Sequence, residues 1–163
     1  MTTLNELAYA QSKGTQATMQ ATKNLMDYCH THSDDMIRYC TRRMQLHIHS
    51  NASYILASKA RSRVDLHFFL SDKFYLTSRT KHSGAVLVVA AILKYMMASA
   101  AEAELVGLLI NAKEGEVLIT SLEEMVHPQG PTPTQIDNST ASGIINKTVK
   151  QRRSKATDMR FFW

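Results

Sequence analysis

The chain has 163 residues, of which 44% are hydrophobic and 20% are charged, enough apolar material for the core of one compact domain. Its longest apolar run, Ala85–Ile92, is much shorter than the roughly 20 residues of a membrane-spanning helix, so we expect no membrane partner. Two cysteines are too few for a disulfide framework, and no basic segment followed by an apolar run opens the chain. We therefore expect an intracellular protein.

The first third of the chain predicts a helix followed by strands. Residues 15–32 have apolar side chains at helical spacing, which indicates one amphipathic helix. Residues 36–40 and 44–49 alternate with a period of two, as half-buried strands do, on either side of a turn at residues 41–43. The alternation breaks at Asn51, so we expect the first long strand to end there.

The middle of the chain predicts two more strands and a long helix. Residues 51–63 are polar and basic, and they lead into an aromatic and aliphatic strand at residues 66–70. Residues 85–90 form a continuous apolar strand candidate. Ser99 is a capping-type residue, and apolar residues then recur at helical spacing as far as residue 125, which predicts one long helix.

All three prolines lie between residues 128 and 133, where they end the long helix. Residues 134–136 then predict a short strand that delivers Asp137 to its end. Ser139 is placed to cap a final helix that begins with Ala141. The order strand, acid, helix is the feature that matters for function.

The formal charge of +5 suits a polyanionic partner, and its distribution is more informative than its size. Two basic groups stand out, one after Asn51 and one near the C-terminus. They are Lys59, Arg61 and Arg63 in the first group, and Lys147, Lys150, Arg152, Arg153 and Lys155 in the second. Such groups can hold phosphates on either side of an acidic centre. The alternative is that both are ordinary solvated surface.

Four segments carry a resemblance to a known family. They read HSNASY continuing to ARSRVDLHFFLSD, then SAAEAELVGLLINAKE, then PTPTQIDNSTASGIIN, and last KTVKQRRSKATDMRFFW. In this order and spacing they resemble the ribonuclease H region of a copia-type retrotransposon polyprotein. The N-terminal stretch LNELAYAQSKGTQATMQATKNLMDYC resembles the end of the reverse-transcriptase connection that precedes this region. The resemblance covers nearly the whole chain.

The resemblance implies an α/β (α+β) fold with a mixed sheet, the ribonuclease H-like fold, here expected to lack its last strand. It also implies two parts, an N-terminal helical connection segment at residues 1–34 and a ribonuclease H-like domain at residues 35–163. The uncovered edge of such a sheet would invite pairing with a second copy of the chain. The implied activity is hydrolysis of the RNA strand of RNA/DNA hybrids with Mg²⁺ or Mn²⁺.

The family motifs assign three site positions in this sequence. Glu104 matches the helix acid and Asp137 the strand acid, both implied metal ligands, whereas Glu102 is better explained as a capping carboxylate. Asn51 stands where the family has its first aspartate, and a neutral amide binds Mg²⁺ more weakly than a carboxylate. The family's last acid would follow Trp163, so we expect it to be missing. The resemblance therefore predicts hybrid binding with weak or absent hydrolysis.

Two other functions remain open from the sequence. An active metal-dependent hybrid endonuclease is the first, and a non-catalytic protein-interaction or oligomerisation module captured from a retroelement is the second. His47 and His49 raise a zinc site as a further possibility, but without more ligands at suitable spacing, histidines with satisfied hydrogen bonds are the better interpretation.

Overall fold

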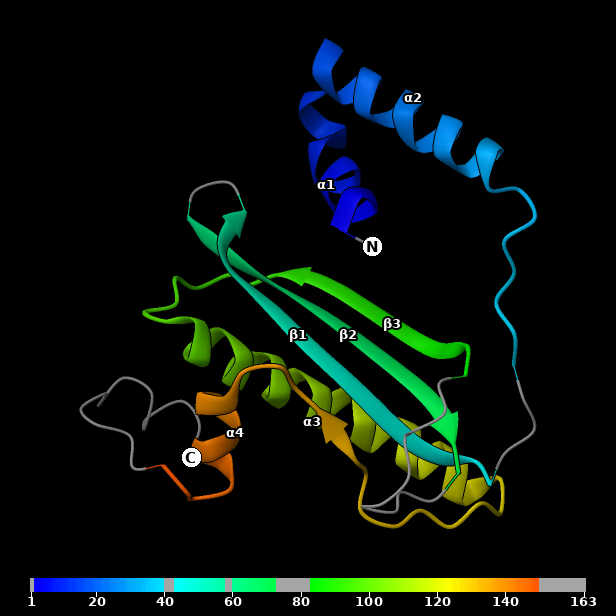
Figure 1. Ribbon diagram of the computed structural model, residues 1–163, viewed down its shortest axis with the longest axis vertical. Coiled ribbons are helices and arrows are strands. Elements are labelled where there is room, and N and C mark those ends of the chain that lie inside the picture. The colour runs from blue at the N-terminus through cyan, green and yellow to red at the C-terminus, as the bar shows by residue number, and fades with distance from the viewer. Residues whose placement is uncertain (1, 40–42, 58–59, 73–82, 150–163) are drawn as a thin grey trace. The chain divides into compact units, whose positions relative to one another are not determined.

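The computed structural model describes residues 2–39, 43–57, 60–72 and 83–149 (Figure 1). The chain divides into two compact units, Met1–Arg38 and Tyr39–Trp163. Described residues of the smaller unit form helices, and those of the larger unit form the sheet and two further helices. Five of the expected phosphate-binding residues lie outside the described residues: Lys59, Lys150, Arg152, Arg153 and Lys155.

Two α-helices and a short 3₁₀ segment make up the smaller unit: α1 at Thr2–Ala10, η1 at Gln11–Lys13 and α2 at Gln16–Thr31. Thr15 caps α2, because its Oγ1 accepts a hydrogen bond of 3.2 Å from the N–H of Thr18. The Thr18 hydroxyl in turn accepts one of 3.3 Å from the N–H of Thr15. The helix predicted over residues 15–32 is confirmed.

The larger unit is built on a four-stranded mixed sheet, so the predicted mixed α/β class is confirmed. Its strands are β1 at Gln45–Ala57, β2 at Arg61–Ser71, β3 at Ala85–Ile92 and β4 at Thr134–Gln135. The spatial order is β3-β2-β1-β4. β2 is antiparallel to both β1 and β3, and β4 is parallel to β1. Among the described residues β4 is an edge strand. Its two residues, Thr134 and Gln135, are exposed and polar.

One long helix, α3 at Ala100–Glu124, lies across one face of the sheet and contacts β1 and β2 (Figure 1). Ser99 caps it as predicted, with its Oγ accepting a hydrogen bond of 3.1 Å from the N–H of Glu102. The core lies between this helix and the sheet. Its buried side chains are Leu46, Ile48, Val64, Leu66, Phe68, Leu93, Met97, Ala103 and Leu122.

Two glycines allow α3 to approach the sheet closely. A Cβ built at Gly107 would lie 3.3 Å from Ser50 Oγ and 3.4 Å from a Val64 methyl carbon, and one built at Gly115 would lie 3.3 Å from Ile48 Cδ1. The helix is continuous through both positions. Packing against the sheet therefore outweighs the low helix propensity of glycine.

The last helix, α4 at Ser139–Ile145, follows β4 directly. Its N-cap is Asn138 and not Ser139 as predicted, since the Asn138 side chain accepts a hydrogen bond of 3.0 Å from the N–H of Ala141. The helix starts two residues earlier than expected.

Two strand predictions around β1 are wrong. Residues 36–39 belong to no strand, and Met36 and Ile37 are both 72% exposed. Asn51 does not end β1 either, because the strand continues to Ala57 and Asn51 pairs with Asp65 of β2. The regular register ends only after Ser53. Pairing with β2 thus extends a strand whose local sequence looked too polar to continue.

Candidate functional site

Glu104 lies early in α3 and is only 2% exposed, although it is a carboxylic acid. Its Oε1 accepts a hydrogen bond of 2.7 Å from the backbone N–H of Ala52 in β1. Its other oxygen, Oε2, is buried and has no hydrogen-bond donor among the described residues. A buried carboxylate oxygen without a donor is costly while it carries charge.

Asp137 follows β4 and contacts the Glu104 carboxyl group. Burial is the largest effect on Glu104 and raises its pKa from 4.5 to about 7, against the lowering effect of the hydrogen bond from Ala52. Charge repulsion from Asp137 and a hydrogen bond between the two side chains raise the pKa further. These effects favour the protonated form of Glu104, which can donate a hydrogen bond to the Asp137 carboxyl group.

This acid pair joins two segments that are far apart in the sequence. Glu104 is positioned by α3 packing on β1, and Asp137 is positioned because β4 pairs with Ile48 and His49 of the same strand. The two predicted acids are therefore brought together. Two carboxyl groups that share one proton can exchange that proton with a reactant, or can hold a divalent cation once both are ionised.

Asn51 lies next to Ala52 in β1, and its side chain is exposed. Ser50 and Ala52 face α3, and successive residues of a strand point to opposite faces. The Asn51 side chain therefore leaves β1 on the face away from α3, within one residue of the backbone donor that binds Glu104. The fold brings its backbone to the site, whereas no contact of its amide group with the acid pair is observed.

Glu102 is not part of the acid pair. It is 7% exposed, and its Oε2 accepts a hydrogen bond of 2.6 Å from the N–H of Ala98, just before the cap of α3. This agrees with the capping role expected from the sequence. Unlike a carboxylate on the exposed face of a helix, the Glu102 side chain is buried.

The described basic residues lie in different environments. Arg63 is only 4% exposed, so its side chain is not presented to a phosphate on the surface, contrary to expectation. Arg61 is half-buried and already makes another interaction. Lys147, just after α4, is exposed. Of the described members of the two basic groups, Lys147 is thus the one placed freely in solvent.

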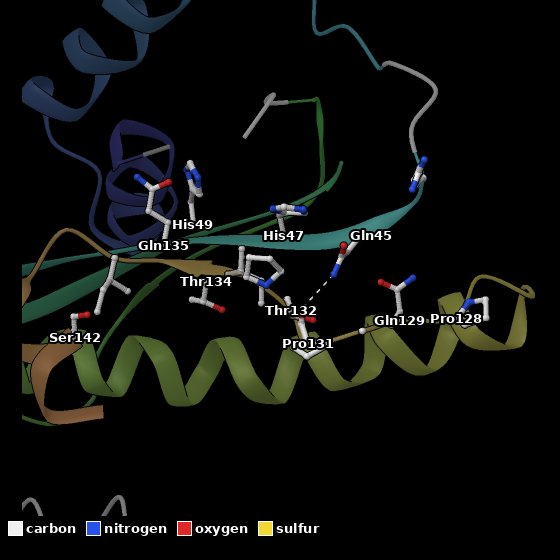
Figure 2. A pocket seen from close by; sticks show the side chains of 15 residues that line it. Gln45, His47, His49, Pro128, Gln129, Pro131, Thr132, Thr134, Gln135 and Ser142 are labelled. Carbon is white, nitrogen blue, oxygen red and sulfur yellow. Dashed lines mark hydrogen bonds between the residues drawn. The ribbon is translucent and has the colours of Figure 1, made fainter. Parts of the chain in front are cut away.

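A pocket of about 920 Å³ lies beside β4, lined by β1, by the proline-rich residues 128–136 and by Ser142 of α4 (Figure 2). Figure 2 shows His47 and His49 on one side of β1, where Gln135 points the same way as His49. His47 Nε2 lies 2.9 Å from the Asp72 carbonyl oxygen, and both imidazole rings pack against Phe69. The described residues that line this pocket include no carboxylate, so neither Glu104 nor Asp137 is among them.

The acid pair supplies only some of the ligands that a divalent ion needs. Within the part of the chain that the structure describes, no group of three or more His, Cys, Asp or Glu side chains is arranged to hold a metal. Glu104 and Asp137 supply two carboxylates, and Mg²⁺ is commonly held by one or two carboxylates with water and phosphate completing its shell. Glu104 and Asp137 could thus supply two carboxylate ligands to a Mg²⁺ or Mn²⁺ ion.

Comparison with known proteins identifies no relative, since no family model, no curated protein and no solved structure matches the chain. Among the described helices, none combines the length and apolar character needed to cross a membrane.

Two groups that hold Glu104 and β1 in place could not be identified from the sequence. The backbone N–H of Ala52 fixes Glu104, and a backbone group carries no residue-type signature. The side chain of Gln129 binds the start of β1, accepting from the N–H of Leu46 at 3.0 Å and donating to the carbonyl oxygen of Met44 at 2.9 Å. Only the folded arrangement brings these groups together.

Proposed function

We propose that this chain carries a ribonuclease H-like domain of a copia-type retroelement, which binds RNA/DNA hybrids and hydrolyses their RNA strand weakly or not at all. The observation that supports it best is the contact between Glu104 and Asp137. These are the two acids that the resemblance assigns to the site, and they come from separate elements 33 residues apart in sequence.

The proposed loss of activity follows from the low negative charge of the site. Hydrolysis of a phosphodiester by two divalent ions needs several carboxylates to hold the ions and to activate water. Here Asn51 stands at the position of the family's first aspartate, and Glu104 holds its proton up to about pH 7. Glu104 is thus not fully ionised at neutral pH, which lowers the negative charge available to hold two Mg²⁺ or Mn²⁺ ions.

In the proposed site, the residues of this chain position the two carboxyl groups. The N–H of Ala52 orients the Glu104 carboxyl group, and β4 places Asp137 against it. A bound divalent ion would supply charge compensation at the scissile phosphate. Lys147, exposed on the α4 side, is available to contact the backbone of the hybrid. Pairing of a second copy along the edge of β4 belongs to the same proposal.

The test is cleavage of a labelled RNA/DNA hybrid by the full chain and by the Asn51→Asp variant, with Mg²⁺ and with Mn²⁺. We expect little cleavage by the wild type. Asn51→Asp adds a carboxylate one residue from the backbone donor that holds Glu104. If this carboxylate reaches a bound ion, cleavage should rise by about tenfold for each 1.4 kcal/mol gained in the transition state. Adding Glu104→Gln or Asp137→Asn should abolish the gain. Glu114→Gln, an exposed glutamate of the same helix, is the matched control.

Hybrid binding separates the proposal from its competitors. Phosphate contacts make affinity fall steeply with salt, so the wild type should bind hybrid more weakly as salt rises. Efficient cleavage by the wild type would favour the active endonuclease. No hybrid affinity at low salt would favour a protein-interaction module and would refute the proposal.

A further inference from the structure

Asn111 is a buried amide in the middle of the interface between α3 and the sheet. It is 1% exposed, and neither its Oδ1 nor its Nδ2 has a hydrogen-bond partner among the described residues. Gly107 and Gly115, one turn to each side, both contact the sheet. Residues four apart share a helix face, so Asn111 faces the sheet between these two close approaches.

Ser50 of β1 is a buried polar side chain beside Gly107, one turn of α3 from Asn111. It is 5% exposed, and its Oγ also has no hydrogen-bond partner among the described residues. The hydroxyl lies beside Gly107, since a Cβ built there would be 3.3 Å away. Helical side chains lean toward the N-terminus of their helix, so Asn111 leans toward Gly107 and hence toward Ser50.

These side chains together form a polar site inside an otherwise apolar layer. Val64 and Phe68 of β2 line the same stretch of α3 and are fully buried. Ser50 offers one donor and an acceptor, and Asn111 offers two donors and an acceptor. Leaving such groups unpaired in the core is costly, and a buried water that bridges two to four polar groups is the usual solution.

We propose that Ser50 and Asn111 hold a buried water molecule between β1 and α3. The water accepts a hydrogen bond from one of the two side chains and donates one to the other. It joins β1 to α3 about two helical turns after Glu104. This inference does not depend on the nuclease proposal, because it concerns packing inside the larger unit and not the chemistry of the acid pair.

The sign of a stability change distinguishes a hydrated site from a dry one. Asn111→Leu replaces the amide by an apolar group of similar shape. At a dry site it should raise the melting temperature, because an unsatisfied amide is removed. At a hydrated site it should lower the melting temperature, on the order of 5 °C, because Ser50 loses its bridging water. Thr120→Leu, on the exposed side of α3, controls for helix propensity.

A double-mutant cycle tests the bridge itself. Ser50→Ala should lower the melting temperature of the wild type, and it should have little further effect in Asn111→Leu, because the water is already lost. A raised melting temperature in Asn111→Leu, or additive effects of the two substitutions, would overturn the proposal. If Asn111→Leu does not fold, nuclear Overhauser effects in the wild type decide between the outcomes. A contact between the Asn111 amide protons and long-lived water supports the site, and its absence refutes it.

Discussion

The backbone N–H of Ala52 donates a hydrogen bond of 2.7 Å to Oε1 of Glu104, which joins the middle of β1 to the first turns of α3. On its other side the same carboxyl group contacts Asp137, beyond β4. Glu104 therefore connects three elements of the larger unit. Its protonation state should affect stability as well as any chemistry, and the acid pair can be tested by both.

Stability should depend on pH through Glu104. Its pKa is raised to about 7 in the folded chain, so the folded state holds a proton that the unfolded state releases near pH 4.5. This contribution is fully present below pH 4.5 and is lost as pH rises to about 7. The two pKa values correspond to about 3 kcal/mol in the free energy of unfolding. Urea unfolding over this range measures it.

Glu104→Gln should remove most of this pH dependence. Glutamine keeps an acceptor for Ala52 and gains a permanent donor for Asp137 without any charge. At about pH 8 the variant should be more stable than the wild type by about 1–3 kcal/mol, and near pH 4.5 the two should be similar. Glu114→Gln should leave the pH dependence unchanged. If the free energy of unfolding of Glu104→Gln changes with pH as steeply as that of the wild type, another group causes the pH dependence.

A divalent ion should stabilise the chain more at high pH than at low pH, because carboxylate ligands must be ionised before they bind it. At an ion concentration ten times its Kd, the stabilisation is about 1.4 kcal/mol. We expect Mg²⁺ or Mn²⁺ to raise the melting temperature at about pH 8 and to have little effect near pH 5. An equal effect in Asp137→Asn would show that the ion binds elsewhere.

Gln129 should matter for stability although it lies in a loop. Its side chain satisfies the N–H of Leu46, which is fully buried, and the carbonyl oxygen of Met44, in place of a neighbouring strand. Gln129→Ala leaves both groups without a partner and should cost about 1–3 kcal/mol in the free energy of unfolding. Gln135→Ala, on the exposed strand β4, is the matched control. Equal stability of Gln129→Ala and wild type would indicate that water replaces the side chain.

Gly143 in α4 should not tolerate alanine. A Cβ there would lie 2.6 Å from Val149 Cγ2 and 3.1 Å from Val149 Cβ, so the chain after the helix must shift. We expect Gly143→Ala to destabilise by about 1–3 kcal/mol, as overpacked sites do, measured by urea unfolding. Val149→Ala should restore most of the loss. Gly14→Ala has nothing within 4 Å of the new Cβ and should be neutral.

The strongly periodic elements could be predicted from the sequence. The apolar spacing of residues 15–32 identified α2, and the Ser99 cap with the apolar spacing after it identified α3. The continuous apolar run identified β3. Glu104 and Asp137 were chosen through a resemblance, since no periodicity marks them. Their contact required β4 to pair with β1, which two residues of strand sequence cannot reveal.

The sequence by itself determined where the apolar periodicity lies and that Ser99 caps the long helix, because these depend on residues within one or two turns of each other. Only the tertiary structure decided how far β1 runs past Asn51, which backbone group meets Glu104 and why α3 carries two glycines. Each of these depends on a partner distant in sequence. A residue's own neighbours report its propensity, whereas the burial and pairing that fix its pKa arise only when the elements pack together.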